Sequence, residues 1–184
     1  MTSSIKMASN ALVLLGDDSL SSFDDATAGA TIANQLYETS YLSILSNFRW
    51  RFATKTINLS QLVNKQESRY TYAFQLPSDL LYLIKVDNSS QYEIFGTELH
   101  SDHREITIDY IYRVSEANLP AYFVKMFEFY LAMQFSIPLT GSIEKSNFYR
   151  IAYEAEAKRA RFSDSTQRPS DTMTASNRYT RVRY

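Results

Sequence analysis

Two histidines and three carboxylates lie close together between residues 98 and 105, namely Glu98, His100, Asp102, His103 and Glu105. Imidazole nitrogens and carboxylate oxygens are common ligands of divalent metals. A spacing of three residues places two side chains on one face of a helix, but the sequence around the two histidines predicts a hairpin loop. There the two rings point to opposite faces. The sequence therefore favours a solvated polar loop, and we expect neither a metal nor a cofactor.

Other residue types suited to catalysis lack the partners that they need. There is no Gly-x-Ser-x-Gly motif, no phosphate-binding glycine motif, and no cysteine for thiolate chemistry or zinc. Adjacent or alternate carboxylates can act as acid and base, but here they are expected in turns, in helix caps or on a solvent-facing helix. These pairs are Asp17/Asp18, Asp24/Asp25 and Glu154/Glu156. We therefore expect that the chain is not an enzyme.

Two segments combine basic and aromatic residues, as single-strand nucleic-acid binders and interaction anchors do. The segment 49–52 (RWRF) is interpreted as a corner in which Trp50 and Phe52 enter the core and the arginines face outward. The segment 163–184 has almost no aliphatic residue. We expect it to be either a frayed terminus or an arm that becomes ordered on a partner. Its candidate anchors are Arg168, Arg178, Tyr179, Arg181, Arg183 and Tyr184.

The charge of the chain is nearly balanced but unevenly distributed. The 184 residues carry a net charge of -1, which argues against bulk electrostatic binding of nucleic acid. From Arg150 onward, eight basic residues stand against four acidic ones, so we expect the arm to meet an acidic partner surface. The 14 tyrosines suit half-buried surfaces and interfaces. We expect no targeting segment, and no apolar run approaches the ~20 residues that span a bilayer.

These side chains must be positioned by helices at both ends of the chain and by strands between them. Helical periodicity predicts helices over about residues 3–15, 25–46, 121–137 and 143–162, with Asp24 or Asp25 capping the second and Pro138 ending the third. The apolar positions of the last helix are Ile143, Phe148, Ile151, Tyr153, Ala155 and Ala157. Alternating patterns predict strands over 49–63, 70–76, 80–86, 92–95 and 105–114.

This order predicts an α+β fold. We expect a bundle of about four helices (1–47 and 115–162), an inserted antiparallel β-rich domain (48–114) and an extended C-terminal arm (163–184). The second helix carries small residues that allow close approach of another backbone. These are Ala26, Gly29, Ala30 and Ala33.

Several short motifs, taken in order, resemble one known family. They are A11LVLLG16, S21SFDD25, Ala33, Leu36-Tyr37, Leu45, W50RFAT54, Y72AFQLPSD79, Ile108–Val114, the helix led by Pro120, and I137PLTG141 followed by a charged helix. In this order and spacing, residues 5–162 resemble phage tail tubular protein A, the head-to-tail connector adaptor of short-tailed, podovirus-like phages. No motif matches the segment 163–184.

The resemblance implies a structural virion protein of the viral tail or neck, assembled in the host cytoplasm. Such adaptors form a homo-oligomeric ring, commonly a dodecamer, between the portal protein and the tail nozzle (tail tubular protein B-like). DNA passes through the lumen during genome ejection without specific binding, and no membrane is involved. On this resemblance, the helical part faces the portal and neighbouring subunits, with Ala26, Gly29, Ala30 and Ala33 in the subunit packing. The arm at 163–184 then runs along the portal or the adjacent subunit. The loops bearing Lys65, Arg69, His100 and His103 face the nozzle. The alternatives are a virion-associated cell-wall hydrolase and a nucleic-acid-binding module.

Overall fold

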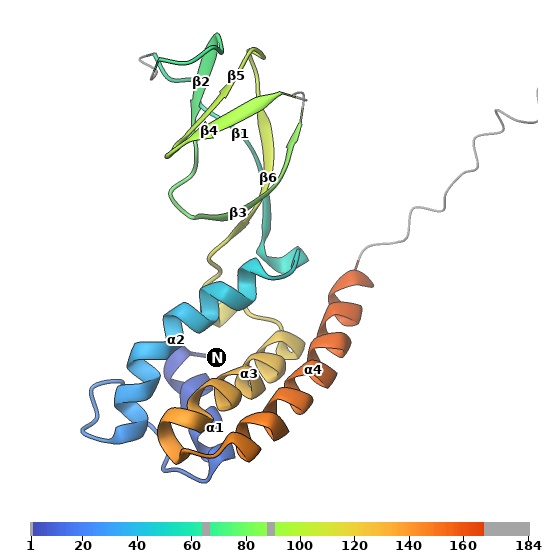
Figure 1. Cartoon of the computed structure of the whole chain (residues 1–184). Coiled ribbons are helices and arrows are strands. Elements are labelled where there is room, and N and C mark those ends of the chain that lie inside the picture. The colour runs from blue at the N-terminus through green and yellow to red at the C-terminus, as the bar shows by residue number, and fades with distance from the viewer. Residues whose placement is uncertain (1, 64–66, 88–90, 168–184) are drawn as a thin grey trace, which may run out of the picture.

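Helices occupy both ends of the described chain and strands occupy its middle (Figure 1). The computed structural model describes residues 2–63, 67–87 and 91–167. Its helices are α1 (Ser4–Leu15), α2 (Ala28–Ser46), α3 (Ala121–Thr140) and α4 (Ile143–Ser165), with short 3-10 helices at Arg51–Ala53 and Glu116–Asn118. Its strands are β1 (Thr54–Asn58), β2 (Tyr72–Gln75), β3 (Leu80–Asp87), β4 (Tyr92–Phe95), β5 (Glu98–Ser101) and β6 (Thr107–Tyr112). The predicted α+β fold is confirmed.

The four helices pack around α3, which contacts each of the other three. Aromatic rings dominate this core because α2 and α3 both present them to the interior. The rings of Tyr41 and Phe127 lie 5.4 Å apart, and those of Trp50 and Phe123 lie 5.2 Å apart at right angles. Edge-to-face pairs of this kind each contribute about 0.5–1.5 kcal/mol beyond the area that they bury. Helix α3 is therefore the centre of the helical core.

The strands form two three-stranded antiparallel sheets above the bundle in Figure 1. One sheet has the order β1-β6-β3 and the other β2-β5-β4. Their shared core is separate from that of the helices and includes Phe74, Leu99, Ile106 and Ile108, each at most 1% exposed. The chain thus has a helical lobe and a β lobe, each with its own apolar interior.

Several predicted boundaries are wrong, and local hydrogen bonds explain two of them. The N-cap of α2 is Thr27, whose hydroxyl accepts a hydrogen bond from the Ala30 amide at 3.1 Å. Asp25 instead accepts three hydrogen bonds from Ser21 and Ser22, and these bonds lower its pKa. Of the predicted strand at 49–63, only β1 (Thr54–Asn58) forms, directly after the 3-10 helix Arg51–Ala53.

The third boundary concerns α3, which continues past Pro138 to Thr140. A proline removes one backbone hydrogen bond, but close to a helix end little further pairing is lost. The Thr140 hydroxyl donates to the Ser136 carbonyl at 2.7 Å, and the Gly141 amide donates to the Ile137 carbonyl at 2.9 Å. Gly141 then ends the helix in the left-handed conformation, with φ 64°.

Candidate interaction surface and lobe junction

Helix α4 carries large apolar side chains on the face that points away from the bundle. Phe148, Ile151 and Phe162 are 65%, 62% and 70% exposed. They lie on one stripe with Ala155, because residues three, four and seven apart share a face of a helix. We call these four residues the outer row. The opposite face of α4 packs on α3 through Tyr149, Tyr153, Ala157 and Ala160.

Charged residues border the outer row, and four of them form ion pairs along the helix. Arg150 pairs with Glu154 at 2.9 Å, and Arg159 pairs with Glu156 at 2.8 Å. Such exposed pairs contribute only a few tenths of a kcal/mol each. Lys158 is exposed and has no ion-pair partner among the described residues. An apolar row with charged borders is typical of a protein–protein interface with a polar rim.

The C-terminal end of α4 is fixed to the junction between the lobes by Asp164. This side chain is 1% exposed and accepts hydrogen bonds from the Arg51 amide and the Tyr122 hydroxyl, both at 2.9 Å. The helix therefore continues through Ser165, so the predicted arm beginning at residue 163 starts too early. From the sequence, Asp164 is predicted to belong to a polar tail, because the neighbouring sequence does not indicate that its partners are Arg51 and Tyr122.

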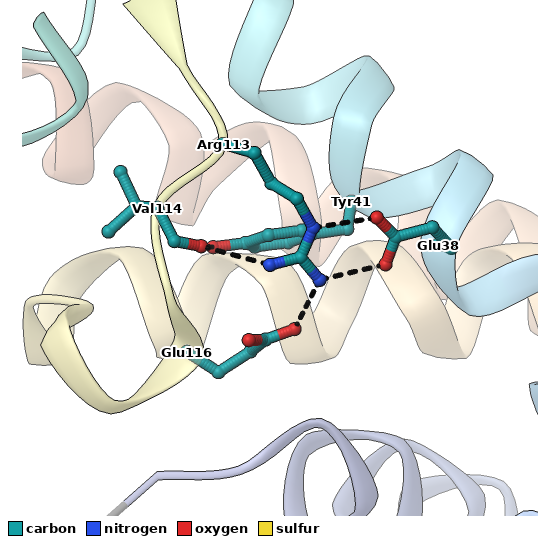
Figure 2. A network of polar contacts seen from close by, with 5 residues as sticks. All are labelled: Glu38, Tyr41, Arg113, Val114 and Glu116. Carbon is teal, nitrogen blue, oxygen red and sulfur yellow. Dashed lines mark hydrogen bonds and ion pairs between the residues drawn. The ribbon is translucent and has the colours of Figure 1, made fainter. Parts of the chain in front are cut away.

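A second set of polar contacts holds the strand that returns from the β lobe (Figure 2). The Arg113 guanidinium follows β6 and donates to both carboxylate oxygens of Glu38 on α2, at 2.7 and 2.9 Å. It also donates to Glu116 at 2.9 Å and lies over the Tyr41 ring, with Cζ 5.1 Å from the centroid. The Tyr41 hydroxyl donates to the Val114 carbonyl at 2.8 Å. These contacts attach α2 to the exit of the β lobe.

The same contacts shift the pKa values of the groups involved. The hydrogen bonds from Arg113 lower the pKa of Glu38, and those to Glu38 raise the pKa of Arg113. Burial raises the pKa of the Tyr41 hydroxyl above its ordinary value. At neutral pH the Arg113 guanidinium and the Glu38 carboxylate are therefore charged and the Tyr41 phenol is neutral. This charge state stabilises the contact between α2 and the end of β6.

Three of the four small residues expected to pack against a neighbouring subunit are buried within this chain. Gly29, Ala30 and Ala33 face the interior, and a Cβ placed on Gly29 would lie 3.1 Å from the Leu12 side chain of α1. The helix that approaches these small residues closely is therefore α1 of the same chain. This corrects the subunit-packing assignment for these three, and of the set only Ala26 is exposed.

The histidine pair is also placed differently from the prediction. His100 lies in β5 and is fully buried, with Nδ1 2.7 Å from the Ser68 hydroxyl and Nε2 2.9 Å from a Glu98 carboxylate oxygen. His103 is exposed in the loop beyond β5. The prediction of a polar loop at 98–105 is therefore wrong for residues 98–101, which form β5. Because the His100 ring is buried, it cannot contact a nozzle. Among the described residues there is no group of three or more potential metal ligands.

The remaining candidate residues that the structure describes lie in separate parts of it and do not form one site. Arg69 is exposed just before β2 and pairs with Glu93. Trp50 and Phe52 pack on Phe123, which confirms the corner interpretation of residues 49–52. Glu154 and Glu156 form the ion pairs given above. The other candidates lie outside the described residues: Lys65, Arg168, Arg178, Tyr179, Arg181, Arg183 and Tyr184.

The signal that sequence reasoning missed is the outer row itself. The last helix has apolar residues on two faces, and periodicity alone does not say which face meets the core.

No protein-family model matches the chain, and no curated protein matches it significantly. No helix in the described ranges is both long and apolar enough to cross a membrane.

Proposed function

We propose that this chain is a structural virion protein, the subunit of an adaptor ring between the portal and the tail nozzle of a short-tailed phage. The observation that supports this most directly is the outer row of α4. Monomeric proteins rarely expose several large apolar side chains in one row, because their hydration is unfavourable. Phe148, Ile151 and Phe162 therefore favour a protein whose surface is completed by other chains.

The two-lobed arrangement supports the same proposal. The β lobe stands at one end of the helical lobe, and both connections are anchored, one by Asp164 and the other by Arg113. An adaptor must hold two different partners at a fixed separation, which requires such anchored lobes. In the proposed assembly the helices meet the portal and neighbouring subunits, the β lobe meets the nozzle, and DNA passes through the lumen of a twelve-membered ring.

The proposal is tested by assembly with virion components. The purified full chain is mixed with portal protein and examined by electron microscopy and light scattering, and a closed ring on the portal is expected. Monomers only, with no binding to the portal, would contradict the proposal.

The C-terminal arm is tested separately, and the structure defines where to cut. A chain ending at Gln167 keeps Asp164 and its two hydrogen bonds, so its thermal midpoint should match that of the full chain. Its affinity for the portal should fall, because the arm carries the candidate anchors. Unchanged docking of this truncated chain would remove the arm from the proposal.

Two other functional classes remain as alternatives with direct assays. A cell-wall hydrolase would clear peptidoglycan in zymography. A nucleic-acid-binding module would bind DNA with an affinity that falls steeply as salt increases. Activity in the first assay, or steep salt-dependent binding in the second, would favour that class over the adaptor.

A further inference from the structure

The helical lobe carries two exposed surfaces of opposite charge. Between residues 7 and 48 there are five carboxylates and no lysine or arginine. Four of the five lie in the connection between α1 and α2: Asp17, Asp18, Asp24 and Asp25. The last two turns of α4 carry Lys158, Arg159 and Arg161, whereas Glu156, just before them, pairs with Arg159, and Asp164 among them is buried. The acidic connection and this basic end of α4 lie on opposite sides of the bundle (Figure 1).

Each charged surface also includes exposed apolar residues. Val13 and Leu14, in the last turn of α1, are 54% and 40% exposed and lie next to the acidic connection. Phe162, at 70% exposure, lies in the same turn of α4 as Lys158 and Arg159. We call the first surface the acidic patch (Val13, Leu14, Asp18 and Asp24) and the second the basic patch (Lys158, Arg159 and Phe162).

The acidic patch offers a place for an aromatic ring. A groove of about 290 Å³ beside it is lined by Asn10, Val13, Leu14, Lys125, Glu128 and Phe129. An apolar cavity of about 150 Å³ is known to accept benzene, so this volume is sufficient for a phenylalanine side chain. Within one chain, α4 contacts α1 near its own N-terminal end, where Lys145 and Tyr149 donate to the Leu15 and Leu14 carbonyls. Phe162 is about five turns away from that end and is exposed to solvent.

We infer that the basic patch of one copy docks on the acidic patch of a second copy, with Phe162 entering the groove between α1 and α3. The contact is heterologous because the two patches differ, and such contacts build rings or filaments rather than closed dimers. The inference rests on the proposed ring and identifies the surfaces that would form it. Electrostatic complementarity of this kind orients the partners and speeds association, while the buried apolar residues give it a slow off-rate.

Charge reversal tests the pairing in the full chain by sedimentation velocity over a range of protein concentrations. One variant carries Lys158→Glu and Arg159→Glu, and the other carries Asp18→Lys and Asp24→Lys. Each variant alone brings like charges together, so self-association should weaken at least about ten-fold at low salt. An equimolar mixture of the two variants should associate like the wild-type chain, because each reversed patch meets a reversed partner.

The controls separate docking from folding and from general charge effects. All four substituted side chains are exposed, so the thermal midpoint should not change. The matched control is Arg104→Glu, which reverses one exposed charge in the loop after β5 and should associate like the wild type, whereas Lys158→Glu alone should weaken association. In a further variant, Phe162→Ala, association should weaken with no change in its salt dependence.

Several results would overturn the inference. These are a wild-type chain that stays monomeric at every concentration, single variants that associate normally, or a mixture that does not recover. Binding of the basic patch to DNA or anionic vesicles, lost in the Lys158→Glu and Arg159→Glu variant while self-association persists, would also overturn it. If the reversed variants still form rings on the portal, this interface is wrong and the adaptor proposal stands. If the wild type associates as described but never binds a portal, the adaptor proposal fails instead.

Discussion

The anchor at Asp164 allows a quantitative prediction for the substitution Asp164→Ala. The carboxylate is buried and accepts two hydrogen bonds at 2.9 Å, from the Arg51 amide and the Tyr122 hydroxyl. A hydrogen bond to a charged group contributes about 1.5–3 kcal/mol, so the two together contribute about 3–6 kcal/mol. The variant no longer buries a carboxylate, which offsets part of the loss. We expect the free energy of unfolding to fall by about 2–4 kcal/mol, which lowers the thermal midpoint by about 5–15 °C.

The protein contains a convenient probe for this experiment. Its one tryptophan, Trp50, is 1% exposed and precedes Arg51 directly, so its fluorescence reports on the junction. Urea denaturation followed by this fluorescence and by far-ultraviolet circular dichroism gives the free energy of unfolding. The circular dichroism follows the helical bundle. Coincidence of the two transitions would show that the bundle and the junction unfold together.

Two controls make the prediction refutable. Asp18→Ala removes an exposed carboxylate and should change stability by less than about 0.5 kcal/mol. Tyr122→Phe removes only one of the two donors and should cost about 1 kcal/mol, and much less when Asp164 is already alanine. A loss for Asp164→Ala no larger than that for Asp18→Ala would refute the anchoring role and the extension of α4 to Ser165.

Three further predictions concern the junction, the helix contact and the β lobe. Because the pKa of Glu38 is lowered in the folded chain, its pairing with Arg113 stabilises the fold above the unfolded pKa of about 4.3. That contribution is lost as pH falls through the lower folded value, so an Arg113→Gln variant should show a weaker acid dependence in pH-resolved thermal melts. Gly29→Val should lower the thermal midpoint by several degrees, because even a Cβ there would lie 2.6 Å from a carboxylate oxygen of Asp17. His100→Ala should destabilise the β lobe by about 2–3 kcal/mol in urea denaturation, because it leaves a buried cavity and unpaired polar groups.

The sequence alone determined which kind of element forms where. Period-3.6 and period-2 patterns located all four helices and most strands, because these patterns reflect which side chains a helix or a strand presents to one face. Strand β5 was missed, since its four residues include Glu98 and His100, which are typical of a surface loop. Only the fold shows that Ser68 and Glu98 satisfy the His100 ring in the interior.

The tertiary structure decided which faces of these elements are covered. The small residues of α2 pack against α1 of the same chain. The local sequence does not predict this partner, because small residues allow any backbone to approach closely. Asp164 reads as part of a polar tail until Arg51 and Tyr122, both distant in sequence, are placed beside it. Helix α4 has two apolar faces of similar periodicity, and packing of Tyr149 and Tyr153 on α3 leaves Phe148, Ile151 and Phe162 outside. Burial depends on contacts between residues far apart in the chain, and a local pattern contains no information about them.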